Sequence, residues 1–216
     1  NVEPFVFHHE EYRNFSDKTA VWGNLKKKYL IDQFNMEPSR IIVSGSPRHD
    51  DYFESITETK KTNEITVLLA PNPITEYSGF VNTELELKFE ETIRQIFSIL
   101  KQFRNINPIV KLHASQLPHN IKIKSLIKKI DSTIPIIQSF SIIEAINDSD
   151  IVIVITPESF GTSTMLLESM ILRKPTMNII LDDEIRQTNH VIEQAVLTVS
   201  NNQDLEKNIR KILFDE

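Results

Sequence analysis

Asp150–Pro175 reads DIVIVITPESFGTSTMLLESMILRKP, and this stretch decides the fold of the chain. It opens with Asp150–Ile155, an uninterrupted β-branched run that is typical of a central parallel strand covered on both faces. A polar turn that contains glycine follows, and the apolar spacing over Gly161–Leu172 predicts a helix. Pro175–Ile180 predicts the next strand, so the stretch forms one β–α–β unit.

The same alternation of strands and helices extends through the chain from residue 64 onward. Repeated β–α units of this length predict an α/β fold, a doubly wound, Rossmann-like parallel sheet of about six strands. Right-handed crossovers place the carboxyl ends of all strands on one edge, where such sheets bind ligands. The further strands are expected at Ile65–Ala70, Pro108–His113, Ile134–Ile137 and Leu197–Val199, and the further helices at Glu84–Arg104, Ile121–Ile130, Ile142–Asn147, Gln187–Ala195 and Asp204–Phe214.

The first quarter of the chain has a different organisation. Residues 1–56 contain three short apolar segments, each of which predicts a strand, and a further segment whose spacing predicts one short helix. A polar linker over residues 57–63 separates this part from a domain over residues 64–216. The chain has no initiator methionine, so we expect it to be a piece of a longer protein. The short segments are Pro4–His8, Thr19–Trp22 and Ile41–Val43, and the helix is Asn24–Phe34.

The composition is that of a globular protein and excludes several classes of function. Hydrophobic residues make up 40% of the 216 residues, charged residues 25%, and the formal net charge is −6. An acidic chain lacks the basic face of nucleic-acid binders, so DNA and RNA are not expected partners. The absence of cysteine excludes a disulfide scaffold and a catalytic thiol, and it fits a cytoplasmic protein. The sequence contains no run of about 18 apolar residues, so it predicts no transmembrane helix.

The start of the helix after the central strand is a candidate ligand site. The first turn of a helix has unpaired N–H groups, and Gly161, Ser163 and Thr164 would let a phosphate approach them closely. Glu168 lies one turn further on the same face, where its carboxylate could accept hydrogen bonds from a ribose. The alternative is that Ser163 or Thr164 only caps the helix and that Glu168 is solvated.

Two other strand ends carry polar side chains. Lys111 and His113 point the same way at the end of an apolar strand, and either could bind a phosphate or a sugar hydroxyl. Both could equally be solvent-exposed. Gly45 and Ser46 form a turn after another predicted strand, and Arg48 adds a cation there, although a plain turn would also explain this segment.

Other motifs are absent or weak. Adjacent residues in His8-His9-Glu10-Glu11 would face opposite sides of a strand, so we expect no metal site there. The chain has no P-loop, no GxGxxG and no GxSxG, which argues against nucleotide triphosphatases, dinucleotide dehydrogenases and serine hydrolases.

Three segments together resemble the C-terminal half of GT-B-fold enzymes, a group that includes nucleotide-sugar glycosyltransferases, UDP-N-acetylglucosamine 2-epimerases and CDP-glycerol glycerophosphotransferases. Residues 20–50 resemble the passage into the inter-domain hinge. VKLHAS (110–115) is similar to the K-x-H-P stretch of these families, and TPESFGTSTMLLESMILRKP (156–175) is similar to the stretch that contacts the donor nucleotide. Ala114 stands where proline is expected, and Arg173 where glycine is expected.

The resemblance implies roles for the candidate residues. Ser163 and Thr164, at the helix that Gly161 opens, would meet the donor diphosphate, and Glu168 the ribose. Gly45 and Ser46 would line the phosphate side, His113 would face the sugar-phosphate, and the base would lie near Ile137–Phe140, at the end of the third strand. Arg48 and Lys111 are further candidates for binding the nucleotide sugar. Residues 1–56 would be the tail of an N-terminal domain and the hinge.

The expected function follows from this resemblance. The complete protein would transfer a sugar or polyol phosphate from a nucleotide diphosphate, UDP or CDP, to a surface-carbohydrate or lipid-linked acceptor. No metal or cofactor is expected, and the catalytic residues would lie mainly in the missing N-terminal domain, so that this chain alone would be inactive. The expected location is the cytoplasm, with the inner face of the membrane as a further option, and the oligomeric state is open. The alternatives are an epimerase-like sugar-nucleotide isomerase and a non-catalytic nucleotide-binding or assembly module.

Overall fold

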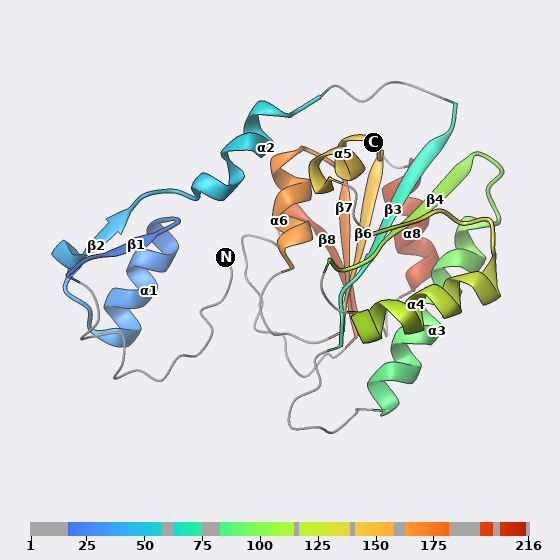
Figure 1. Cartoon of the computed structure of the whole chain (residues 1–216), viewed down its shortest axis with the longest axis horizontal. Helices are drawn as coiled ribbons and strands as arrows, with labels where there is room; N and C mark the ends of the chain where they lie inside the picture. Colours follow the sequence, from blue (N-terminus) through green and yellow to red (C-terminus); the bar gives the residue numbers. More distant parts are fainter. Residues whose placement is uncertain are drawn as a thin grey trace.

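The computed structural model describes residues 17–57, 63–74, 83–114, 117–138, 141–157, 163–181, 195–200 and 204–214. A six-stranded sheet, in which every neighbouring pair is parallel, forms the centre of the larger part of the molecule (Figure 1). The strand order β5-β4-β3-β6-β7-β8 is that of a doubly wound sheet, which confirms the predicted fold class. The strands are β3 (Ile65–Pro71), β4 (Ile106–Lys111), β5 (Ile136–Ile137), β6 (Ile151–Thr156), β7 (Thr176–Ile180) and β8 (Leu197–Ser200).

Two hydrophobic cores cover the two faces of this sheet. The strand β6 is buried along its whole length: Ile151, Ile153 and Ile155 pack into one core, and Val152 and Val154 into the other. This alternation is the physical reason for the uninterrupted apolar run in the sequence. The first core includes α3 (Thr83–Leu100), α4 (Leu117–Ile130) and α8 (Leu205–Phe214), and the second includes α5 (Ile142–Asn147) and α6 (Thr164–Ile171).

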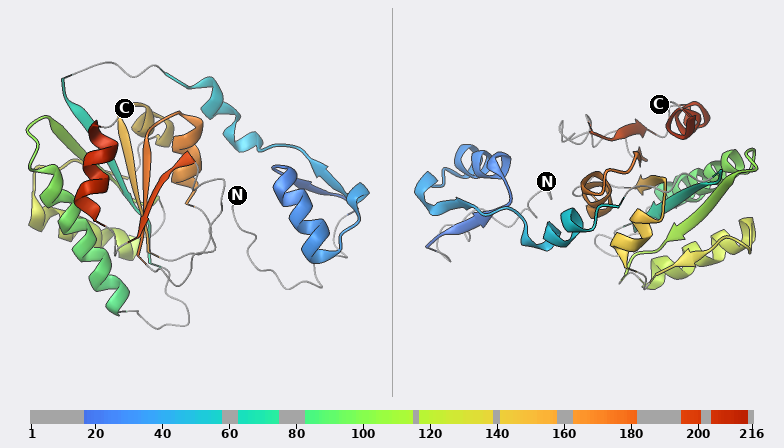
Figure 2. Two further views of the ribbon diagram at one scale, coloured as in Figure 1. Left: turned by 180° about the vertical axis from the view of Figure 1, so that it is seen from behind. Right: turned by 90° about the horizontal axis from the view of Figure 1, so that it is seen from above.

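The N-terminal part of the described chain is a small separate unit. β1 (Thr19–Val21) and β2 (Ile41–Val43) form a parallel pair, and α1 (Asn24–Phe34) packs on it. Its own core consists of Val21, Leu30, Met36 and Ile41. Figure 2 shows this unit beside the large sheet, joined to it by the hinge segment. A single turn of 3-10 helix, η1 (Pro38–Arg40), precedes β2, and the hinge segment consists of η2 (Pro47–His49) and α2 (Asp50–Glu54).

The predicted and observed elements differ in a few places. The helix α1 and the strand β2 have the predicted bounds, and the β8 edge strand is confirmed. The strand β4 begins and ends two residues earlier than predicted, and α6 begins at Thr164 rather than Gly161. The helix α3 ends at Leu100, four residues before the predicted end, and α4 begins at Leu117, four residues before the predicted start. The hinge helix α2 was not predicted. The segments predicted at Pro4–His8 and over residues 187–194 lie outside the described residues, and the domain boundaries remain predictions. Within the described ranges, no helix combines the length and hydrophobicity needed to cross a membrane.

Candidate functional site

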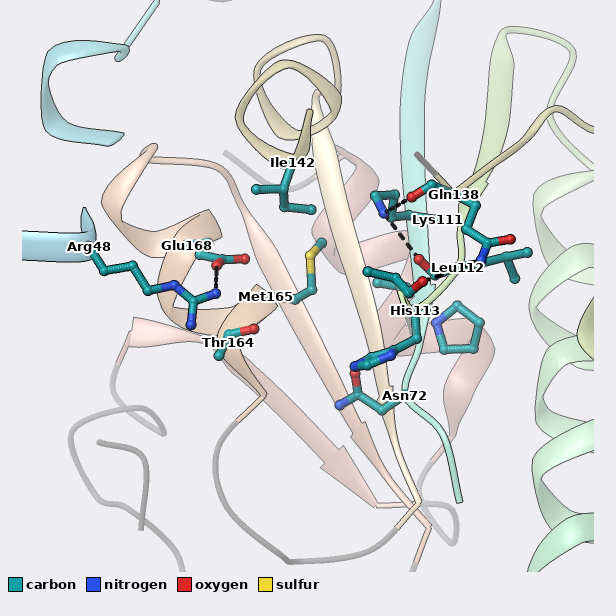
Figure 3. Close-up of a pocket in the computed structure, with 13 residues that line it drawn as sticks. Arg48, Asn72, Lys111, Leu112, His113, Gln138, Ile142, Thr164, Met165 and Glu168 are labelled. Atoms are coloured by element: carbon teal, nitrogen blue, oxygen red, sulfur yellow. Dashed lines mark hydrogen bonds and ion pairs between the residues drawn. The ribbon is translucent and has the colours of Figure 1, made fainter. Parts of the chain in front are cut away.

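A cavity of about 430 Å³ lies at the edge of the sheet where its strands end (Figure 3). The ends of β3 and β4 and the first turns of α6 surround it. This is the edge at which doubly wound sheets bind ligands. The lining residues are Arg48, Ala70, Pro71, Asn72, Lys111, Leu112, His113, Ala114, Gln138, Ile142, Thr164, Met165 and Glu168.

Glu168 is the most unusual of these residues because it is a carboxylate that is only 3% exposed. The hydroxyl of Tyr52 donates a hydrogen bond to its Oε1 at 3.0 Å. Arg48 Nη2 lies 3.7 Å from the same oxygen. Burial of an ionised carboxylate is costly unless partners compensate it, and these two groups are such partners. The alternative of a solvated helix glutamate is therefore wrong.

The two carboxylate oxygens of Glu168 differ in their surroundings. Both contacts fall on Oε1, and within the described part of the chain none falls on Oε2. Because Glu168 lines the cavity, Oε2 is the oxygen left for a ligand hydroxyl.

Arg48 brings a cation from the hinge to the rim of the cavity. Its side chain is 65% exposed, in contrast to the buried carboxylate it faces. An ion pair at 3.7 Å with one exposed partner contributes little to stability. The guanidinium can therefore exchange this contact for an anionic ligand at small cost.

Lys111 is the last residue of β4 and is buried, so the alternative of a solvent-exposed lysine is wrong for this position. Its ammonium donates to the carbonyls of Leu112 at 3.1 Å and Gln138 at 3.0 Å, as Figure 3 shows. Burial lowers the pKa of Lys111, while the charge of Glu168 opposes that shift. Lys111 thus fixes the loops after β4 and β5 and places a positive charge beside the cavity.

His113 lies two residues beyond the end of β4, at a position that is solvent-exposed, as the alternative predicted, and it lines the same cavity. Partial desolvation at the cavity wall, followed by the charge of Lys111, lowers the pKa of His113 below 6.5. The imidazole is therefore neutral at pH 7 and can both donate and accept a hydrogen bond. Its main-chain carbonyl accepts from Asn120 Nδ2 at 2.7 Å, which ties this loop to α4.

The helix α6 begins at the cavity. Ser163 occupies the N-cap position but makes no side-chain cap hydrogen bond; its hydroxyl donates instead to Asn72 Oδ1 at 3.2 Å. Ser163 is therefore at the predicted capping position but does not cap the helix through its side chain. Thr164, the first helical residue, lines the cavity together with Met165. The first-turn amides and the positive end of the helix dipole thus lie at the cavity wall.

Gly45 and Ser46 do not line this cavity. They border a second, more apolar cavity of about 600 Å³ between the N-terminal unit and the outer side of α6. Gly45 turns the chain in the left-handed region, with φ of 73°, and η2 then carries Arg48 toward Glu168. Of the three hinge residues in the sequence prediction, the structure therefore brings only Arg48 to the Glu168 cavity.

Gly161 and Phe140 lie outside the described residues. Gln138, which follows β5 near the expected base position, lines the cavity. In the described ranges, no cluster of three or more His, Asp or Glu side chains is arranged to hold a metal ion.

Sequence reasoning missed two residues of the site. Asn72 follows a predicted strand within Pro71-Asn72-Pro73, at the same edge as the other candidates, and this position could have identified it. Tyr52 has no comparable signal, because it lies 116 residues from Glu168 in the sequence.

No protein-family model and no curated protein matches the sequence. Among solved structures, the chain is similar to a glycosyltransferase from Rickettsia africae, with 18% identity and a TM-score of 0.54 over 95% of this chain and 56% of that one. It is also similar to the Anabaena protein HepE in complex with UDP-glucose, with 11% identity and a TM-score of 0.53 over 97% of this chain and 59% of that one. The chain thus spans less than two thirds of the length of either structure.

The chain has the fold of these two structures over the part that they share. The predicted resemblance to the C-terminal half of GT-B enzymes is confirmed at the level of the fold. The roles of the individual site residues remain predictions.

Proposed function

We propose that the complete protein is a glycosyltransferase and that this chain binds its nucleotide-diphosphate donor in the Glu168 cavity. The observation that carries the proposal is the buried Glu168 carboxylate beside Lys111, Arg48 and the start of α6. One acceptor oxygen and several positive groups in one cavity match a ligand that has both a diol and a diphosphate.

The cavity suggests how each part of the donor would be bound. The ribose would donate to Glu168 Oε2, and the diphosphate would lie against the first turn of α6 within reach of Arg48. His113, which is neutral at pH 7, would face the sugar. As the glycosidic bond breaks, the leaving nucleotide diphosphate gains negative charge, and the helix amides and cations would stabilise it. The proposal requires no bound metal or cofactor.

The finer assignments belong to the same proposal. UDP is the first donor to test, because HepE, which shares the fold, was solved with UDP-glucose. The acceptor, a carbohydrate or a lipid-linked surface glycan, would bind to a part of the protein outside this chain. A cytoplasmic location completes the proposal.

The direct test is titration of the chain with UDP-glucose, CDP-glucose and GDP-glucose by calorimetry and thermal denaturation. A donor at about 100 times its dissociation constant should stabilise the fold by roughly 2.7 kcal/mol. Glu168→Gln should weaken binding of that donor about tenfold, since it removes a charged hydrogen-bond acceptor. Glu90→Gln, on the exposed side of α3, removes the same charge and should change nothing.

Two outcomes of these experiments would contradict the proposed donor site, and a third would favour a different activity. If no nucleotide stabilises the chain, or if Glu168→Gln binds as tightly as the parent, the donor site is wrong. Conversion of UDP-N-acetylglucosamine by the complete protein without any acceptor would favour the epimerase alternative.

A further inference from the structure

Tyr52 is the only residue of α2 that is buried, with 5% of its surface exposed. Its ring packs into the core on the α5–α6 face of the sheet, together with Leu68, Ala70 and Val152. The ring of His49 contacts it at a centroid distance of 5.5 Å. These contacts leave the ring little freedom, so they also fix the position of its hydroxyl.

The hydroxyl of Tyr52 has one described partner, Oε1 of Glu168. Burial, followed by the charge of Glu168, raises the pKa of Tyr52 well above its ordinary value of 10.0. The phenol therefore stays protonated and donates to the carboxylate throughout the physiological range.

The segment that carries Tyr52 is itself anchored to the large domain. Ser55, directly after α2, accepts a hydrogen bond from Asn147 Nδ2 at 2.8 Å through its carbonyl. The carbonyl of Asn147 in turn accepts from the buried ammonium of Lys174 at 2.8 Å. α2 is thus held against α5 and the corner between α6 and β7, so Tyr52 reaches Glu168 from a fixed support.

We infer that Tyr52 is a positioning residue, which occupies Oε1 of Glu168 and so directs Oε2 toward the ribose of a bound nucleotide. This inference rests on the proposed donor site. Without the phenol, the carboxylate could rotate or turn to Arg48, and its geometry toward a ribose diol would no longer be fixed. The hinge segment would then contribute to donor selectivity through a residue that does not touch the donor.

The test is the preference for ribose over deoxyribose, because a general loss of structure would not change this ratio. Binding of UDP and CDP to the 216-residue chain is compared with binding of 2′-deoxy-UDP and 2′-deoxy-CDP by calorimetry. The parent chain should prefer the ribose form of its nucleotide by about tenfold, the effect of one hydrogen bond to a charged group. Tyr52→Phe should reduce this preference to about twofold, mainly by weakening the ribose form.

The matched control is Tyr29→Phe, which removes a phenol from an exposed position on α1 and should leave the ratio unchanged. In a Glu168→Gln background, Tyr52→Phe should have little further effect on the ratio, because both changes remove the same interaction. Tyr52→Met, which also fills the site with an apolar side chain, should repeat the result if the phenylalanine variant is poorly folded.

The outcomes separate this inference from the proposed function. A parent chain that prefers ribose and a Tyr52→Phe chain that keeps the full preference would overturn the positioning role and leave the donor site intact. A lower melting temperature with an unchanged ratio would also overturn it, since Tyr52 would then be purely structural. A parent chain that binds neither nucleotide would overturn the donor site and this inference together.

Discussion

His119, on the first turn of α4, is a half-buried base whose ring lies 5.5 Å from that of Phe89. Its Nε2 is buried and has no hydrogen-bond partner among the described residues. Burial above all, and then the charges of His113 and Lys122, lower the pKa of His119 from 6.5 to about 4, against opposing contributions from Glu86 and a hydrogen bond to the Pro71 main chain. The folded state thus disfavours the imidazolium.

A defined pH dependence of stability follows from this shift. Between pH 6.5 and about 4 the unfolded chain binds a proton at His119 and the folded chain does not, so the free energy of unfolding falls as the pH falls through this window. His119→Gln should make that decline shallower, as measured by urea unfolding at a series of pH values. From pH 7 to 8 both states are neutral at His119, and there the variant and the parent should show the same slope. An unchanged slope below pH 6.5 would contradict the prediction.

For single residues, the sequence predicted membership of the site well where a residue directly follows a strand. It predicted membership poorly where a residue reaches the site from a distant segment. Lys111 and His113 were identified because parallel strands end at one edge, and Glu168 because of its spacing from the start of a helix. Tyr52 was missed because its role depends on a contact between the hinge and α6, which no local pattern encodes. The placement of Gly45 could not be predicted either, because a turn sequence gives the bend and not its position relative to the cavity.

The C-terminus of α6 explains a departure seen in the sequence. Arg173 stands at the position where the resemblance predicts glycine, and its φ of 58° lies in the left-handed region. The amide of Arg173 donates to Met170 and that of Lys174 to Ser169, both at 3.0 Å, which is a Schellman arrangement. The chain thus keeps the glycine conformation with a residue that has a Cβ, at a cost of about 1 kcal/mol.

Replacing this arginine with glycine should therefore stabilise the protein. We expect Arg173→Gly to raise the free energy of unfolding by about 0.5–1 kcal/mol, because relief of the strain exceeds the added entropy of the unfolded chain. Arg173→Ala keeps the Cβ and should give no gain. Asn35→Gly should gain less, since asparagine tolerates the left-handed φ of 51° at that position. Urea denaturation of the three variants checks this, and equal effects of alanine and glycine at position 173 would refute it.

At the scale of the elements, the hydrophobic pattern of the sequence predicted which helices and strands are present better than it predicted where each of them begins and ends. The sequence pattern predicts that β4 starts at Pro108, whereas the strand begins at Ile106. Proline is tolerated there because β5 pairs only with Val110 and Lys111, so that β4 has a single partner strand at Pro108. The hinge helix α2 is too short to show a helical period, and the burial of Tyr52 is explained only by its tertiary contacts with the sheet and with α6.

The whole molecule contains cores of very different size. Among residues 17–43 of the described chain, four buried hydrophobic residues form the core of the N-terminal unit, whereas two extensive cores cover the sheet of the larger domain. Fewer buried side chains stabilise these residues than stabilise the central strands, while the entropy of ordering each residue is similar. Local opening of residues 17–43 should therefore cost less free energy than opening of the central strands.

Hydrogen exchange followed by mass spectrometry would measure this difference. Peptides from β1, α1 and β2 should exchange well before those from β3 and β6, whose amides open only with the global unfolding of the domain. Leu30→Ala should accelerate exchange within residues 17–43 and leave the melting of the sheet unchanged. Ile153→Ala removes a fully buried side chain of β6 and should cost about 2–5 kcal/mol of global stability, with faster exchange throughout the domain. If Leu30→Ala instead destabilised both parts equally, the N-terminal unit and the large domain would unfold as one cooperative unit. The contacts of α2 alone would then not account for the coupling between the two parts.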